Sequence, residues 1–259
     1  HDAARLSSGI FTLLALEFIL LAARELHGRE NAAAAPLILA GSIGFLFHAH
    51  EAQPMLAALT AHTAAYWALT LLPRRPALAT LAFGAAIALG FLANGLLPVL
   101  TLLPVTMYTL WQSGTRRICA LLVTIAIALA LFLSALWLLP LRMASPYFFS
   151  IFLQSELDSL TKSVSFFSNT LRYLNLLLWY AWPALPLAAW ALWSKRRILR
   201  SRPMALPIFS FLSVLLILGL SVEVRSSAAL LLLPPLVLLA VPGVATLRRG
   251  AANAFDWFG

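Results

Sequence analysis

The chain has 259 residues, of which 62% are apolar and only 10% are charged. Soluble globular domains carry roughly 45–50% apolar and about 25% charged residues, so this composition excludes a soluble globular fold. The net charge is +9, but the basic residues form short clusters between apolar runs and no continuous basic face, which argues against nucleic-acid binding. The single cysteine, Cys119, excludes an internal disulfide and a cysteine-based metal site.

Apolar stretches recur along the whole chain, and each is long enough or nearly long enough to cross a bilayer as a helix. We therefore predict an all-α, polytopic transmembrane fold of about nine spans, built as a single domain over residues 1–259. The predicted spans cover residues 6–26, 34–50, 54–72, 77–93, 96–112, 118–139, 173–193, 205–222 and 228–246.

The basic residues divide unevenly between alternate loops of this scheme. One set of loops holds 13 of the 18 lysines and arginines, and the other set holds five. Because cytoplasmic loops carry an excess of Lys and Arg, the richer set is predicted to be cytoplasmic. Residue 1 then lies on the outer side of the membrane, and since the chain also begins without Met, we expect it to be a segment of a longer protein.

One outer loop, residues 140–172, is much longer than the others. Ser145 and Pro146 have the pattern of a helix N-cap followed by proline in the first turn. After them, apolar side chains fall on one helical face and polar ones on the other, which predicts a helix lying in the outer interface. Such a helix could serve as a lid or anchor, or as the wall of a groove for a lipid substrate. The apolar face holds Phe149, Leu153, Leu157 and Leu160, and the polar face holds Gln154, Asp158 and Thr161.

The densest polar cluster lies at the outer junction of the second and third predicted spans. It contains His48, His50, Glu51 and Gln53, and His62 follows within the third span. Glu51 and His62 are eleven positions apart, close to three helical turns, so we expect them to share a face. Imidazole and carboxylate groups could bind a divalent metal, form a polar rim that contacts a substrate, or make a structural hydrogen-bonded cluster. The spacing is not that of a zinc-binding HExxH motif.

Three arginines are expected on the same outer side, namely Arg142, Arg172 and Arg225. A guanidinium can bind two phosphate oxygens at once, so these residues could hold the headgroup of a phosphate-bearing lipid. The alternative for each is an interfacial side chain that extends to the lipid headgroups. Arg225 is the strongest candidate, since it lies in a short loop between two deep spans.

Six segments, in their order along the chain, resemble one family of membrane enzymes. They lie at residues 2–8, 23–29, 88–95, 173–186, 233–236 and 248–259. The family is that of the bacterial GT-C glycosyltransferases, of the protein O-mannosyltransferase and aminoarabinose transferase type. The resemblance extends over essentially the whole chain. It implies a GT-C-like membrane fold located in the bacterial inner membrane, with an active site that faces the periplasm.

The resemblance also implies an activity, the transfer of a sugar from a polyprenyl-phosphate donor to a lipid or protein acceptor. The family's main general base lies in its first outer loop, which would precede residue 1, so this segment is not expected to be active alone. Within the chain we predict Glu51 and His50 as catalytic residues. The predicted substrate-binding residues are Arg225, His48, Gln53, His62, Arg142 and Arg172. No cofactor is certain; a divalent metal is possible.

Two other functions remain open at this stage. One is a transporter or flippase of a lipid-linked saccharide, which should show paired, broken spans in two related halves. The other is a non-catalytic membrane subunit. The sequence contains no internal repeat, and this favours the enzyme.

Overall fold

The computed structural model describes residues 2–51, 53–113, 116–161, 165–221, 224–244 and 246–247. Regular structure in these ranges is helical, and they contain no strand. The helices are α1 (Asp2–His27), α2 (Arg29–Ala32), α3 (Ala34–Gly41), α4 (Ile43–Ala49), α5 (Met55–Leu71), α6 (Pro76–Asn94), α7 (Leu96–Gln112), α8 (Arg116–Ala144), α9 (Pro146–Thr161), α10 (Phe166–Tyr180), α11 (Ala184–Ser194) and the 3-10 turn η1 (Arg196–Ile198). They continue with α12 (Arg202–Gly219), the 3-10 helix η2 (Ser227–Leu232) and α13 (Leu233–Val244).

The predicted all-α membrane fold is confirmed. Five helical segments are long and apolar enough to cross a bilayer, and the number rises to seven if each of two bent helix pairs counts as one span. Two further apolar helices, α5 and α7, have 17 residues each. The total of nine spans stays a prediction. The five segments are Leu6–His27, Pro76–Asn94, Arg116–Ala144, Arg202–Gly219 and Ser227–Val244.

Two of the predicted spans, 34–50 and 173–193, are bent and are not continuous helices. The first is bent by 64° between α3 and α4, where Ser42 leaves helical geometry and its hydroxyl donates to Ile38 O at 2.8 Å. The second is bent by 99° between α10 and α11, beside Pro183, which lacks the N–H that a continuous helix needs. The two bends meet, because the N–H of Ile43 donates to Trp182 O at 3.1 Å.

Polar contacts join the basic loops at one end of the bundle. Arg74 pairs with Glu25 at 2.9 Å, and Arg202 Nη2 donates to Leu69 O at 3.3 Å. Because α5, α6, α7 and α8 alternate in direction, the starts of α5 and α7 and the end of α8 lie at the opposite end. We call this the outer end, and Glu51, Gly95 and α9 belong to it.

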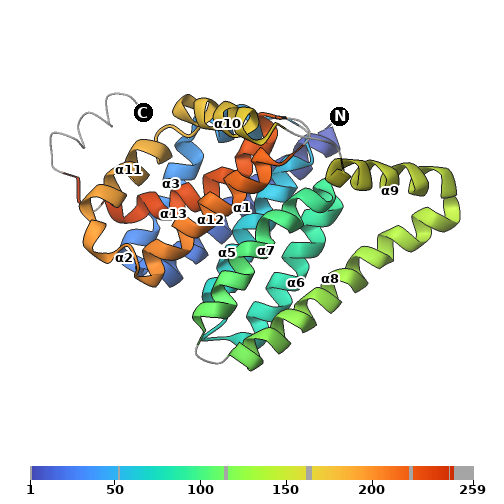
Figure 1. Ribbon diagram of the computed structural model, residues 1–259, viewed down its shortest axis with the longest axis horizontal. Coiled ribbons are helices and arrows are strands. Elements are labelled where there is room, and N and C mark those ends of the chain that lie inside the picture. The colour runs from blue at the N-terminus through green and yellow to red at the C-terminus, as the bar shows by residue number, and fades with distance from the viewer. Residues whose placement is uncertain are drawn as a thin grey trace.

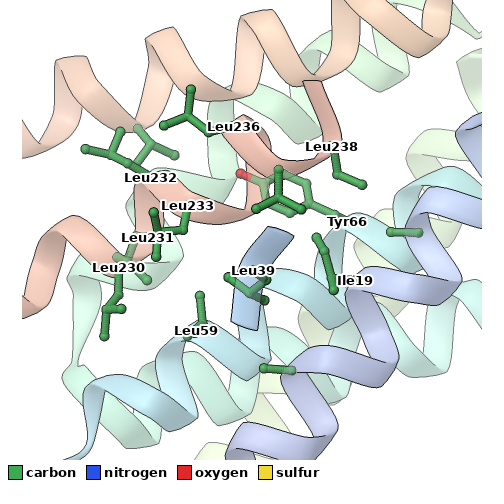
Figure 2. Packing of buried hydrophobic residues seen from close by; sticks show 14 of the residues in the cluster. Ile19, Leu39, Leu59, Tyr66, Leu230, Leu231, Leu232, Leu233, Leu236 and Leu238 are labelled. Carbon is green, nitrogen blue, oxygen red and sulfur yellow. The ribbon is translucent and has the colours of Figure 1, made fainter. Parts of the chain in front are cut away.

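The core lies where α1, α3 and α5 meet η2 and α13. Ile19, Leu39 and Tyr66 are fully or almost fully buried there, and Figure 2 shows them beside the leucines of residues 230–238. Of the Ser227–Val244 segment, 83% is buried. This apolar segment is therefore surrounded by protein and forms the centre of the bundle.

On the other side of the molecule, α8 diverges from the bundle and α9 returns toward it, so that α7, α8 and α9 frame an open triangle in Figure 1. Helix α9 begins at Pro146, where the sequence predicts a helix start. Leu153 and Leu157 of the predicted apolar face are exposed, and Phe152 packs edge-to-face against Phe91 of α6 and Trp137 of α8. The location of this helix in the outer interface stays a prediction.

Candidate functional site

The histidine–carboxylate cluster forms at the turn between α4 and α5. Nδ1 of His48 lies 2.8 Å from Oε2 of Glu51, and Nε2 of Gln53 donates to the same oxygen at 3.1 Å. The N–H of Glu51 also donates to His48 O at 3.1 Å, which fixes the turn. The Glu51 side chain is 49% exposed. The carboxylate is thus held in one orientation and remains accessible from the outer end.

His48 itself is buried and faces α10. Its ring centroid lies 5.9 Å from that of Tyr180, and both rings are almost fully enclosed. Tyr180 packs directly on Gly44, one turn before His48, where any Cβ would overlap its ring. Neither His48 Nε2 nor the Tyr180 hydroxyl has a hydrogen-bond partner within the described residues. The exposed His50 follows at the end of α4.

The expected common face of Glu51 and His62 is not present. Helix α5 begins only at Met55, so Glu51 lies in the turn before it and helical spacing does not relate the two residues. His62 is fully buried, with Nε2 2.7 Å from Thr101 Oγ1 and Nδ1 3.0 Å from Ala58 O. These contacts join α5 to α7 and give His62 a structural environment.

Hydrogen bonds join α10, the helix that carries Arg172, to the loop that carries Arg225. The N–H of Arg225 donates to the hydroxyl of Tyr173 at 3.3 Å, and Asn169 Nδ2 donates to Ser221 O at 2.9 Å. Both arginines are exposed. Both side chains are therefore accessible to a ligand, and their predicted role in binding a phosphate stays a prediction.

Arg142 lies apart from this pair, near the outer end of α8. Its guanidinium carbon is 5.9 Å from the ring centroid of Phe149 in α9, within the range of a cation–π contact. Both residues line a cavity of about 810 Å³, bounded by α6, α7, α8 and α9. This cavity could not be predicted from the sequence, because the apolar residues around it are typical of any lipid-facing helix.

The walls of the cavity are almost entirely apolar. Thr106 and Thr124 line it, but each hydroxyl donates to a carbonyl of its own helix, Leu102 O at 2.8 Å and Ala120 O at 3.0 Å. Arg142 supplies the charge at one end. The residues that line the cavity are Phe83, Ile87, Phe91, Leu96, Val99, Leu102, Leu103, Thr106, Met107, Leu110, Ala120, Val123, Thr124, Ile127, Ala130, Leu131, Ser134, Ala135, Leu138, Leu139, Arg142 and Phe149.

A carboxylate fixes α9 above the cavity. Glu156 Oε2 accepts the first N–H of α7, that of Leu96, at 2.7 Å. Gly95 precedes it with φ +64°, and a Cβ there would overlap the Glu156 carboxylate. Glycine is therefore required both by the backbone conformation and by the close approach of α9. No role was predicted for Glu156. A negative side chain stabilises a helix N-terminus, but here that N-terminus belongs to α7, sixty positions earlier in the chain.

No group of three or more His, Cys, Asp or Glu residues comes together in the described part of the chain. The open possibility of a divalent metal thus gains no support from the histidine–carboxylate cluster.

Comparison with known structures finds two forms of one enzyme. This chain superposes on ArnT from Cupriavidus metallidurans bound to undecaprenyl phosphate with a TM-score of 0.81 at 19% identity, and on the apo state with 0.75 at 21%. Both alignments cover 97% of this chain. The fold is that of ArnT. The chain spans about half of the ArnT chains, 48% and 47%. No family model and no curated protein matches the sequence.

Proposed function

We propose that the chain is part of a membrane glycosyltransferase, which moves a sugar from a polyprenyl-phosphate donor to a lipid or protein acceptor at the periplasmic face of the bacterial inner membrane. The observation that carries the proposal is the long apolar cavity with Arg142 at its outer end. A polyprenyl phosphate has matching chemistry, a long hydrocarbon with one anionic end. The ArnT structure with the higher TM-score is bound to undecaprenyl phosphate.

The phosphate of such a donor is the leaving group, and its negative charge grows as the bond from the sugar to oxygen breaks. Arginines at the outer end would stabilise that charge more in the transition state than in the ground state. Arg142 is assigned to the phosphate of a donor whose tail enters the cavity. Arg172 of α10 and Arg225, whose N–H donates to Tyr173 of α10, are assigned to the leaving phosphate or to the acceptor.

Glu51 is the proposed proton acceptor within this chain, with His50 exposed beside it. Two donors orient its Oε2, and the side chain stays accessible. A base must reach the proton that it removes and must be held in position. We propose that Glu51 acts alongside the main general base that the resemblance to the GT-C enzymes implies outside this segment.

The test is sugar transfer by the purified full-length protein that contains this segment, in detergent, measured as release of undecaprenyl phosphate from a sugar-linked donor. Arg142→Ala or Arg225→Ala should lower the rate by roughly 30- to 1,000-fold. Lysine at either position should restore part of the rate, because it keeps the positive charge but cannot bind two phosphate oxygens with a planar guanidinium. Glu51→Gln should also lower the rate. Arg75→Ala, at the opposite end of α6, is the control. Wild-type rates in both arginine variants and in Glu51→Gln would refute the site.

A second candidate, a transporter of a lipid-linked saccharide, is favoured by one observation. The two bent helix pairs meet at their bends, where Ile43 N–H bonds to Trp182 O, and broken spans are typical of transporter binding sites. Proteoliposomes separate the two functions. A transporter moves the labelled lipid between leaflets without cleaving it, whereas a transferase releases the lipid phosphate in the presence of acceptor.

A further inference from the structure

The cavity is unusually deep for a site that needs to hold only a headgroup. Along α8 its lining extends from Ala120 to Arg142. Those 22 steps of helix correspond to about 33 Å, close to the ~30 Å thickness of the hydrocarbon core of a bilayer. The inner end is lined by Leu110 of α7 and Ala120 of α8. The cavity therefore follows nearly the whole length of the helix.

Side-chain size along α8 creates this depth. Ala120, Ala130 and Ala135 all line the cavity, and each leaves space that a larger side chain would fill. At the back, α6 approaches α8 so closely that a Cβ at Gly84 would lie 2.7 Å from Ala126 O. The cavity is thus closed behind by α6, and its sides are α7 and α8.

The two ends of the cavity differ in chemistry. Arg142 lies at the outer end, and the residues at the inner end are apolar or, like Thr124, bonded within their own helix. A ligand with an anion at one end and a hydrocarbon tail can enter in one direction only. A longer tail makes more van der Waals contacts with the apolar wall, so it would bind more tightly until it reaches the inner end.

We infer that the cavity holds the tail of a polyprenyl phosphate along most of its depth, and that Ala120 and Thr124 determine how long a tail it accepts. The inference rests on the proposed function for the identity of the lipid. It adds a determinant of tail length, located at the far end of α8 from the reacting phosphate.

The test is equilibrium binding of two probes to the purified protein, undecaprenyl phosphate and the much shorter farnesyl phosphate. Ala120→Trp should weaken undecaprenyl phosphate by roughly tenfold or more and leave farnesyl phosphate unchanged, because only the longer tail reaches the inner end. Thr124→Phe should have the same effect. Ala135→Trp, near Arg142, should weaken both lipids.

The matched control is Ala128→Trp, an exposed alanine of α8 that does not line the cavity, and it should change neither affinity. An Ala120→Trp variant that binds both lipids as the wild type does, or that loses both equally, would overturn the inference while leaving the donor assignment intact. If the wild-type protein binds neither lipid, the donor itself is wrong. Displacement of undecaprenyl phosphate by an equal concentration of dioleoyl phosphatidic acid would show a general lipid site and would also overturn the inference.

Discussion

Two apolar segments of this chain have opposite surroundings. The segment Ser227–Val244 is 83% buried at the centre of the bundle, whereas only 28% of an 18-residue apolar window within Arg116–Ala144 is buried. Both pass as membrane spans by length and composition. Hydropathy therefore indicates that a segment avoids water, but not whether protein or lipid replaces the water. Helix α8 contributes little to the core, and its apolar surface is free to form the wall of a lipid site.

The largest expected effect contrasts one leucine from each segment. Leu231→Ala should lower the free energy of unfolding by about 2–4 kcal/mol, because the side chain is fully buried and leaves a cavity. Leu131→Ala should change it by less than about 0.5 kcal/mol, since Leu131 is 67% exposed on α8. Thermal unfolding in detergent measures both. Equal losses would mean that α8 packs against protein along the cavity.

A smaller effect is expected where α6 and α8 come closest. Gly84→Val should destabilise the protein by about 1–3 kcal/mol, because its Cβ would lie 2.7 Å from Ala126 O and must push the helices apart. Gly9→Val is the control, since nothing lies within 4 Å of a Cβ there. The same thermal assay applies. Matching stabilities would show that α8 can move away from α6 without cost.

The sequence predicted most of the elements of the fold and fewer of their contacts. Apolar runs located the spans, and the resemblance to GT-C enzymes gave the fold that the ArnT structures share. The bend at Ser42 could not be found, because Ser42 is the one polar residue in the stretch 34–47 and the hydrogen bond from Ile43 N–H to Trp182 O joins distant segments. The bend at residue 183 had a signal in Pro183, inside a predicted span.

In the candidate site, too, local contacts could be predicted from the sequence and long-range contacts could not. The link from His48 to Glu51 joins residues three positions apart, so sequence proximity was sufficient to find it. His62 was grouped with Glu51 by helical spacing, although α5 begins after Glu51. Glu156 contacts a backbone N–H sixty positions away, and the cavity arises from four helices. Long-range features of this kind have no local pattern in one sequence.

A buried polar contact gives the next effect in size. Thr101→Val should cost about 1–2 kcal/mol of stability, because it removes the hydroxyl that lies 2.7 Å from His62 Nε2 and leaves that nitrogen buried without a partner. The double variant His62→Phe with Thr101→Val should recover much of the loss, since both polar groups are then absent. Denaturation of the wild type, Thr101→Val, His62→Phe and the double variant completes a double-mutant cycle. A double variant less stable than Thr101→Val would instead indicate that the histidine ring packs irreplaceably.

The smallest expected effect concerns the contact that closes the triangle of helices. Glu156 holds α9 by accepting the N–H of Leu96 at the positive end of α7. Glu156→Ala should cost only about 0.5–1 kcal/mol of global stability, the usual value of a helix cap, but it should speed amide hydrogen exchange throughout α9. Glu156→Gln keeps an acceptor without the charge and should lie between alanine and wild type. The control is Gln154→Ala, an exposed position on the same helix. Phe149 and Phe152 keep their contacts in every variant. If amide exchange in α9 were the same in Glu156→Ala as in the wild type, these aromatic contacts alone would keep α9 in place.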